Sequence, residues 1–269
     1  MDNIPIFVVS RFNMPLSPKS MDGAWLNSRL EPFAKFTVPA LAAQSDADFT
    51  WLVVVQPGTP EHIIAAIDAA KSSVPQLRVM YAQNTRAAIR KLVAECDNER
   101  VITVRLDTDD MVSRDFIALI RRNLRGKRLR FLNFDHGLVY DCKSESLYRR
   151  TYLYSPFIAV LEPRGNIRGI YAYNHCAIHL IAPVKHLRLP PHWLQVVHGG
   201  NWMNKIQGLP VKKELLNGFP NQPIAPPVNL TPSQKRAYFK ALLTQHVTRG
   251  IYRVLRFVKP SMKYRYITK

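Results

Sequence analysis

The residue types best suited to chemistry lie between Val101 and Asp110, in the segment VITVRLDTDD. An apolar, β-branched run there ends in three aspartates within four positions, Asp107, Asp109 and Asp110. Open α/β sheets bind ligands at the carboxyl ends of their strands, and clustered carboxylates repel one another unless a cation or hydrogen bonds neutralise them. Because oxygen ligands suit Mg²⁺ or Mn²⁺, the pattern predicts a divalent metal at a nucleotide or phosphate site.

A plainer interpretation of this segment is a solvated acidic turn in which Asp110 or Ser113 caps the next helix. Several other signatures are excluded by spacing. A calcium EF-hand loop would need an oxygen ligand and then a glycine where Met111 and Val112 stand. The chain also has no Walker A loop, no G-x-G-x-x-G element and no H-E-x-x-H pair. What remains is a D-x-D-D element at the end of a strand.

Composition sets the broad class of the protein. The chain has 269 residues, of which 47% are hydrophobic, enough for one sizeable domain with a full core. Its three cysteines, Cys96, Cys142 and Cys176, are far apart, which excludes a disulfide scaffold or a zinc ribbon and indicates a reducing cytoplasm. The N-terminal segment MDNIPIFVVS has no basic region, and no apolar run reaches membrane-spanning length. We expect a cytoplasmic protein, either soluble or peripheral at the inner membrane.

The formal net charge of +19 is extreme for this length and is concentrated towards the C-terminus, where Glu214 is the last acidic residue. Such an imbalance implies a polyanionic neighbour, which could be nucleic acid, an anionic membrane face or an acidic substrate. A helix predicted near the C-terminus has one basic and one apolar face. Its faces carry Arg249, Arg253 and Arg256 on one side, and Ile251, Val254, Leu255 and Val258 on the other.

The first half of the chain alternates between strand and helix patterns. The expected strands are Ile4–Ser10, Phe49–Val55, Leu77–Tyr81 and Val101–Leu106, and the expected helices are Ala24–Lys35, Pro60–Ala70 and Thr85–Glu95. This βαβαβαβ order predicts an open, mostly parallel sheet with helices on both faces and with all four strand ends at one edge.

The second half has a different pattern. Leu129–Phe134 and Leu138–Tyr140 predict a hairpin, and Ile158–Leu161 and Ala177–Ile181 predict two further strands. We divide the chain into a catalytic α/β domain over residues 1–219, a Pro-rich linker over 220–232 and a basic, amphipathic helical extension over 233–269.

A family resemblance extends over most of the chain, from Ile6 to Asn201. The residues that carry it are Ser10-Arg11-Phe12-Asn13, Trp25-Leu26, Arg29-Leu30, Phe33, Pro39-Ala40-Leu41, Gln44, Phe49-Thr50-Trp51-Leu52-Val53, Arg105-Leu106-Asp107-Thr108-Asp109-Asp110, Ser155-Pro156-Phe157, Glu162 and Trp193-Leu194-Gln195-Val196-Val197-His198-Gly199. In these positions the chain resembles the GT-A glycosyltransferase fold, and within it the bacterial rhamnosyltransferase family. The match is more specific for the fold than for rhamnose as the sugar.

The resemblance implies a metal-dependent glycosyltransferase that moves a sugar, with rhamnose as the candidate, from a UDP-, dTDP- or GDP-linked donor to a cell-envelope or capsular glycan. Mn²⁺ or Mg²⁺ would stabilise the diphosphate leaving group. Asp107 would bind the ribose or reach the metal through water, Asp109 would ligate the metal, and His198 would contact the metal or the diphosphate. Arg11, Asn13 and Arg105 would bind the donor. A loop histidine at 198 and a salt bridge from Arg105 into the acidic cluster are the structural alternatives.

An inverting transfer needs a carboxylate that removes the proton of the acceptor hydroxyl. Beyond Asp115 the only acidic residues are Asp135, Asp141, Glu145, Glu162 and Glu214. We favour Glu162 over Asp135 because Glu162 follows an apolar run in a segment that resembles the family. Its structural alternative is an ion pair with Arg164 or Arg168.

Two other classes of function compete with this one. In a nucleic-acid-binding protein or nuclease, the positive charge would bind phosphates and the aspartates would hold Mg²⁺. The ordinary mixed charge of the first part of the chain and the lack of a nucleic-acid motif count against it, so we expect an anionic membrane surface rather than nucleic acid as partner. A catalytically inactive GT-A scaffold is the other candidate, and the intact D-x-D-D element counts against it.

Overall fold

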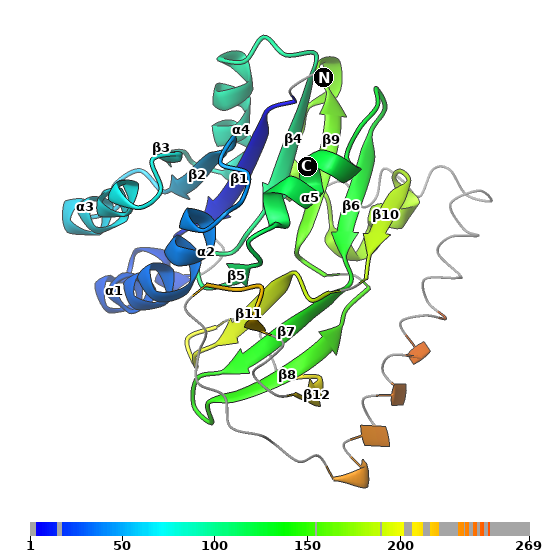
Figure 1. Ribbon diagram of the computed structural model, residues 1–269. Coiled ribbons are helices and arrows are strands. Elements are labelled where there is room, and N and C mark those ends of the chain that lie inside the picture. Colours follow the sequence, from blue (N-terminus) through cyan, green and yellow to red (C-terminus); the bar gives the residue numbers. More distant parts are fainter. Residues whose placement is uncertain are drawn as a thin grey trace.

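The computed structural model describes residues 4–14, 18–153, 155–188, 190–201, 206–211 and 216–220, and short stretches between 231 and 247. The described part is built on two β-sheets, with helices packed on the larger one (Figure 1). The predicted α/β class is therefore confirmed.

The larger sheet has seven strands in the order β10-β6-β9-β4-β1-β2-β3. Its strands are β1 (Ile6–Arg11), β2 (Thr50–Val55), β3 (Leu77–Tyr81), β4 (Arg100–Arg105), β6 (Arg130–Phe134), β9 (Ile158–Pro163) and β10 (Val184–Leu187). The strands β1 to β4 are parallel, as the sequence predicts, and their carboxyl ends share one edge. Because β9 is antiparallel to both β4 and β6, strand β6 runs parallel to β4 and ends at that same edge.

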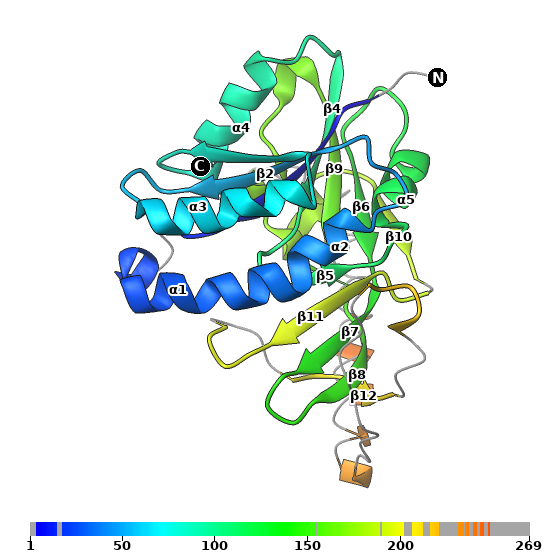
Figure 2. The same cartoon turned by 60° about the vertical axis from the view of Figure 1, so that its left-hand side comes forward.

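Helices cover both faces of this sheet, as predicted (Figure 2). They are α1 (Gly23–Pro32), α2 (Val38–Ala42), α3 (Glu61–Ala69), α4 (Thr85–Ala94) and α5 (Phe116–Asn123). Ile89 of α4 packs in one apolar cluster with Val9, whereas Ile63 of α3 and Ile117 of α5 pack in another with Val8. Since consecutive strand residues point to opposite faces, α4 lies on one face and α3 and α5 lie on the other.

The first helical run is longer than the sequence predicts. Instead of ending near Lys35, the chain continues from α1 through the π-helical turn η2 (Phe33–Thr37) into α2. The N–H of Val38 donates to the carbonyl oxygen of Phe33, and the wider turn accommodates Pro39, which has no N–H to donate. This continuous run brings α1 and η2 against the loop that follows β4.

The second sheet has five strands in the order β12-β8-β7-β11-β5. Its strands are β5 (Met111–Val112), β7 (His136–Asp141), β8 (Ser146–Thr151), β11 (Trp193–Val197) and β12 (Leu209–Pro210). The hairpin predicted from Leu129 to Tyr140 is wrong, because β6 and β7 lie in different sheets and β7 pairs with β8 instead. The chain passes between the sheets at Asp135, whose N–H donates to Leu187 and whose carbonyl accepts from Tyr152.

The strand predicted over Ala177–Ile181 is also wrong. This segment is part of the 3-10 helix η6 (His175–Leu180), which begins where the side chain of Asn174 accepts the N–H of Cys176. Its apolar residues, among them Ile178, pack on the larger sheet against Ile158. A short apolar run alone cannot distinguish a buried strand from a buried helical turn.

The C-terminal extension is described only in part. Several residues between Thr231 and Val247 are helical, and Phe239, Leu243 and Val247 among them are exposed. The predicted arginine face, from Arg249 onwards, lies outside the described residues, as does most of the predicted linker. Within the part that the structure describes, no helix is both long and apolar enough to cross a membrane.

Candidate active site

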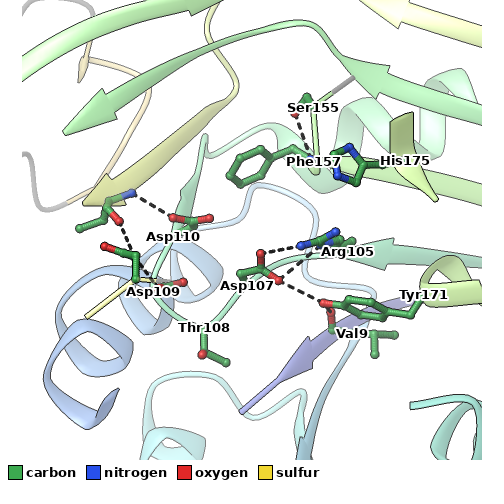
Figure 3. Close-up of polar contacts among 12 residues, drawn as sticks. Val9, Arg105, Asp107, Thr108, Asp109, Asp110, Ser155, Phe157, Tyr171 and His175 are labelled. Atoms are coloured by element: carbon green, nitrogen blue, oxygen red, sulfur yellow. Dashed lines mark hydrogen bonds and ion pairs between the residues drawn. The ribbon is translucent and has the colours of Figure 1, made fainter. Parts of the chain in front are cut away.

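The loop after β4 places its three aspartates in three different environments (Figure 3). Asp107 points towards Arg105 and Tyr171, whereas Asp109 and Asp110 turn towards the second sheet. The mutual repulsion of the carboxylates is thus relieved by a separate set of partners for each one.

Asp107 is held by Arg105 from its own strand. The Arg105 Nη2 atom lies 2.9 Å from Oδ2 of Asp107, and Nε lies 3.4 Å from Oδ1. Burial alone would raise the pKa of Asp107, but the charges of Arg105, Arg11 and Arg29 and the hydrogen bond from Arg105 outweigh it and lower the pKa to about 2. The salt bridge given as the structural alternative for Arg105 is therefore present.

Three arginines surround Asp107, which leaves an excess of positive charge at this edge. Arg11 lies with its Cζ 4.1 Å from the ring centroid of Tyr171, and Arg105 lies 5.4 Å from the same centroid. Arg29, on α1, reaches the loop through a 2.5 Å bond from Nη2 to Oγ1 of Thr108. One carboxylate does not balance three guanidinium groups, so the cluster suits a further anion such as a diphosphate.

The tyrosine between these arginines comes from the 3-10 helix η5 (Ile170–Ala172). The hydroxyl of Tyr171 donates to the carbonyl of Val9 at 3.3 Å and lies 3.4 Å from Oδ1 of Asp107. Burial and the charge of Asp107 raise the pKa of Tyr171 to about 12. Its phenol therefore stays protonated at neutral pH and fixes the position of Asp107.

Asp109 meets residues from the segment that follows β11. Its Oδ2 atom lies 3.1 Å from Nε2 of His198 and 3.0 Å from Nδ2 of Asn201. Asn201 also donates to the carbonyl of Val196 and accepts the N–H of His198, so it holds the turn in place. The predicted proximity of Asp109 and His198 is thus found, although 89 residues separate them in the chain.

Asp110 is buried inside the protein and does not face the site. It is 1% exposed, its Oδ1 accepts the N–H of Val196 at 2.9 Å, and its carbonyl accepts the hydroxyl of Thr37. Burial, together with the charges of Asp109 and Asp107, raises the pKa of Asp110 well above its usual range. This residue fastens the second sheet and η2 to the acidic loop.

Of the predicted metal ligands Asp107, Asp109 and His198, only Asp109 and His198 are placed to hold a divalent ion. Among the described residues, no group of three His, Cys, Asp or Glu side chains has a metal-binding arrangement. Asp109 and His198 supply a carboxylate oxygen and an imidazole nitrogen at adjacent positions, while Asp107 is turned to Arg105. Mg²⁺-type ions are commonly held by one or two side chains plus substrate phosphates, so this pair suits an ion that arrives with a diphosphate.

Asn13, predicted to bind the donor, has internal partners instead. Its side chain is 1% exposed, donates from Nδ2 to Oγ1 of Thr59 at 2.9 Å, and accepts the N–H of Gln56 at 3.0 Å. These bonds join the ends of β1 and β2. The contacts place Asn13 beneath the site as a support, while Arg11 remains beside the acidic loop.

Glu162, the favoured base, lies at the wrong end of the sheet. It is the register partner of Val101, at the start of β4, because β9 runs antiparallel. Six residues along a strand correspond to roughly 20 Å between Glu162 and Asp107. The carboxylate is buried and accepts the N–H groups of Arg168 at 3.0 Å and Gly169 at 2.9 Å. Glu162 thus holds the turn at Arg168 and Gly169 through backbone N–H groups, and not through the ion pair with Arg164 or Arg168 that was its structural alternative.

Asp135, the second candidate base, lies at the correct edge. Asp135 follows β6, whose carboxyl end is level with that of β4. The side chain is fully buried, and its Oδ1 atom lies 2.6 Å from both Nδ1 of His186 and Nδ2 of Asn133. The geometry therefore reverses the order in which we ranked Glu162 and Asp135.

Sequence reasoning missed three contributors to this site, namely Arg29, Tyr171 and Asn201. Arg29 belonged to the segments that carry the family resemblance, but nothing local assigned it to the acidic loop. Tyr171 and Asn201 lie in irregular segments without periodicity, so only the tertiary structure brings them to Asp107 and Asp109.

The family model described as "Putative rhamnosyl transferase" matches residues 19–209 of this chain. The matched stretch includes the acidic loop, η5 and β11, and covers more than half of the sequence. The chain therefore belongs to this family.

Solved structures show similarity at low identity, and no curated protein sequence matches the chain. Staphylococcus aureus TarS 1-349 in complex with UDP-GlcNAc is 10% identical with a TM-score of 0.46, over 91% of this chain and 73% of that one. The match to another S. aureus TarS structure covers 72% of this chain but only 37% of that chain, at 9% identity and a TM-score of 0.43. HddC from Yersinia pseudotuberculosis is 10% identical with a TM-score of 0.36, over 72% and 93% of the two chains.

Proposed function

We propose that this protein is a metal-dependent glycosyltransferase of the GT-A type, which transfers a sugar, rhamnose in our proposal, from a nucleoside-diphosphate donor with inversion. The observation that carries this proposal is the Asp109–His198 pair beside the cluster of Arg11, Arg29 and Arg105, at the carboxyl edge of the parallel strands. Membership in the rhamnosyl transferase family supports the same conclusion.

The side chains divide the work of binding the donor. Asp109 and His198 would hold Mn²⁺ or Mg²⁺, which when bound stabilises the developing charge of the diphosphate leaving group as a Lewis acid. The guanidinium groups of Arg11 and Arg29 bind phosphate oxygens from the other side. Asp107 keeps Arg105 in a fixed orientation, because it accepts two hydrogen bonds from it. A preorganised charge of this kind needs no rearrangement during the reaction.

We propose a cell-envelope or capsular glycan as acceptor, reached at the anionic inner face of the membrane. The net charge of +19 supports this, as does the helical stretch after Thr231, where exposed Phe239, Leu243 and Val247 are spaced at four-residue intervals. Four-residue spacing places side chains on one helix face, and Lys235, Arg236 and Lys240 lie nearby. In this proposal residues 1–219 form the catalytic domain, 220–232 a linker and 233–269 a membrane-binding extension.

A donor screen tests the proposal directly. The melting temperature of the full chain would be measured with UDP-, dTDP- and GDP-linked sugars, each with Mn²⁺ and with EDTA. We expect one nucleotide class to raise the melting temperature in Mn²⁺ and to lose most of this effect in EDTA. If none of the donors raises the melting temperature in a metal-dependent way, the proposal is contradicted.

A further inference from the structure

We infer that His186 is the general base that accepts the proton of the acceptor hydroxyl and that Asp135 is its positioning residue. This inference rests on the proposed transferase function and deepens it. The two residues come from different elements, since His186 lies in β10 and Asp135 follows β6. Neither is needed to hold the donor at the metal-binding pair described above.

The pair is built around a buried carboxylate. Asp135 has 0% exposure, and its Oδ1 atom is 2.6 Å from Nδ1 of His186 and 2.6 Å from Nδ2 of Asn133. The ring of His179 stacks on that of His186 at a centroid distance of 5.3 Å, and Nε of Arg188 lies 3.9 Å from Oδ2 of Asp135. An ionised carboxylate in this position selects the His186 tautomer with the proton on Nδ1, so that Nε2 carries the lone pair.

The register of the sheet places Asp135 at the same edge as the donor-binding residues. Asn133 pairs with Ile158, and β9 pairs with β4 so that Asp135 and Asp107 stand at the same level. Two strand spacings, about 10 Å, separate Asp135 from Asp107, and His186 on β10 lies one spacing further from β4, level with Asn133. Side chains alternate along each strand, so both carboxylates project from the same face.

Two half-buried residues near these groups, Tyr152 and His175, can line an acceptor site. In Figure 3 His175 lies close to Arg105, whereas Ser155 and Phe157, which precede β9, are buried behind this surface and Phe157 stacks on Trp193. The ring of Tyr152 packs edge-on against His175, with 6.3 Å between the ring centroids. The backbone N–H of Tyr152 donates to the carbonyl of Asp135. An aromatic and imidazole lining of this kind suits the apolar face of a sugar.

The proton and electron balance of the step is simple. The acceptor oxygen forms a bond to the anomeric carbon as its proton passes to Nε2 of His186. The bond from that carbon to the phosphate oxygen breaks, and its electron pair leaves with the nucleoside diphosphate. The Asp135 carboxylate, 2.6 Å from Nδ1, stabilises the resulting imidazolium, as in other sites where an acidic residue orients a histidine base.

Nitrogen-15 NMR of the full chain, with and without His186→Gln to assign the signal, tests the tautomer without any ligand. We expect the His186 ring to be protonated on Nδ1 in the wild type and to lose this preference in Asp135→Asn. Protonation of Nε2 in the neutral wild-type ring would overturn the inference, whatever the donor is.

Turnover provides the second test, using release of dTDP from dTDP-rhamnose in Mn²⁺ with water as acceptor, and calorimetry of dTDP binding. His186→Gln should lower turnover about 10²-fold or more while dTDP affinity stays within about twofold of wild type. His62→Gln, an exposed histidine on α3, is the matched control and should match wild type in both. Wild-type turnover by His186→Gln would overturn the inference alone, whereas failure of wild type to bind any nucleoside diphosphate would contradict the proposed function.

Discussion

Asp109 and Asp110 are neighbours in the chain but have opposite surroundings. Asp109 is paired with His198 at the edge of the site, whereas Asp110 is buried beneath it and accepts a backbone N–H from β11. The chain turns between them, since the N–H of Asp110 donates to the carbonyl of Asp107, and the two side chains therefore meet different elements. Burial, together with the charges of Asp109 and Asp107, raises the pKa of Asp110. Two adjacent carboxylates can therefore coexist here without two cations.

Glu162→Gln should lower stability and not catalysis. Both Glu162 oxygens accept backbone N–H groups, from Arg168 and Gly169, and the hydroxyl of Tyr173 donates to Oε1 at 2.6 Å. An amide turns one acceptor into a donor that faces an N–H, which should cost about 1–3 kcal/mol. Urea unfolding measures this loss, and turnover per folded molecule should stay near wild type. A 10²-fold loss of turnover without a loss of stability would instead restore Glu162 as the base.

His192 gives the fold a pH dependence with a definite sign. Its ring is buried beside Ser113, with Nδ1 3.1 Å from Oγ, and burial lowers its pKa from 6.5 to about 4 despite the opposing charge of Asp115. Between pH 6.5 and 4 the unfolded chain binds this proton and the folded chain does not, so stability should fall by about 3 kcal/mol as the pH drops through that window. His192→Asn keeps a donor for Ser113 and should flatten this part of the stability curve. An unchanged slope in the variant would refute this assignment.

Residue chemistry and the family resemblance together indicated which segments meet at the acidic loop. The D-x-D-D element identified the loop, and the family resemblance suggested that His198 belongs beside it, because late histidines recur in such sites. The sequence could not show that Asn13 is an internal support, because its partner Thr59 lies 46 positions away. The same limit applies to Arg29, whose bond to Thr108 joins residues 79 positions apart.

At the scale of elements, the direction of β9 decides which acidic residue can act. The parallel strands β1 to β4 could be predicted from local periodicity, and so could their common edge. The rule that functional side chains follow strand ends holds only for strands that run the same way. Since β9 is antiparallel, Glu162 at its end lies far from the edge, whereas Asp135 after β6 lies at it. Strand partners are long-range contacts that no local pattern specifies.

Gly137→Ala should disrupt the attachment of β11 to β7. A Cβ on Gly137 would stand 1.9 Å from Cδ2 of Trp193, whose ring stacks on Phe157 at 4.8 Å and donates to the carbonyl of Phe134. Because β11 leads to His198, overpacking here should cost about 3 kcal/mol or more and weaken nucleotide binding as well. Denaturant unfolding and calorimetry measure both effects.

Gly165→Ala is the matched control for that variant, since nothing lies within 4 Å of its added Cβ. It should leave stability and nucleotide affinity near wild type. Equal stability of the Gly137 and Gly165 variants would show that β11 shifts without cost, contrary to the close packing seen around Trp193.

At the scale of the whole molecule, the excess of 38 basic over 19 acidic residues should direct binding to anionic surfaces. We expect the full chain to co-sediment with phosphatidylserine-containing vesicles at low salt, and truncation after Thr231 should abolish this. Each basic residue near such a surface contributes about 1 kcal/mol, and the interaction weakens as salt screens it. Equal sedimentation of the two forms would exclude the extension as the membrane-binding part.

The most direct test of the central claim is calorimetry of dTDP and UDP binding to four forms of the full chain, in Mn²⁺ and in EDTA. The forms are the wild type, Asp109→Ala, Asp110→Asn and, as a control, Asp97→Ala, which removes an exposed aspartate that forms an ion pair with Arg164. We expect the wild type and the Asp110 and Asp97 variants to bind at least one nucleotide in a metal-dependent way. In Asp109→Ala the affinity for that nucleotide should fall at least tenfold. Undiminished metal-dependent binding by Asp109→Ala would contradict the assignment of this site.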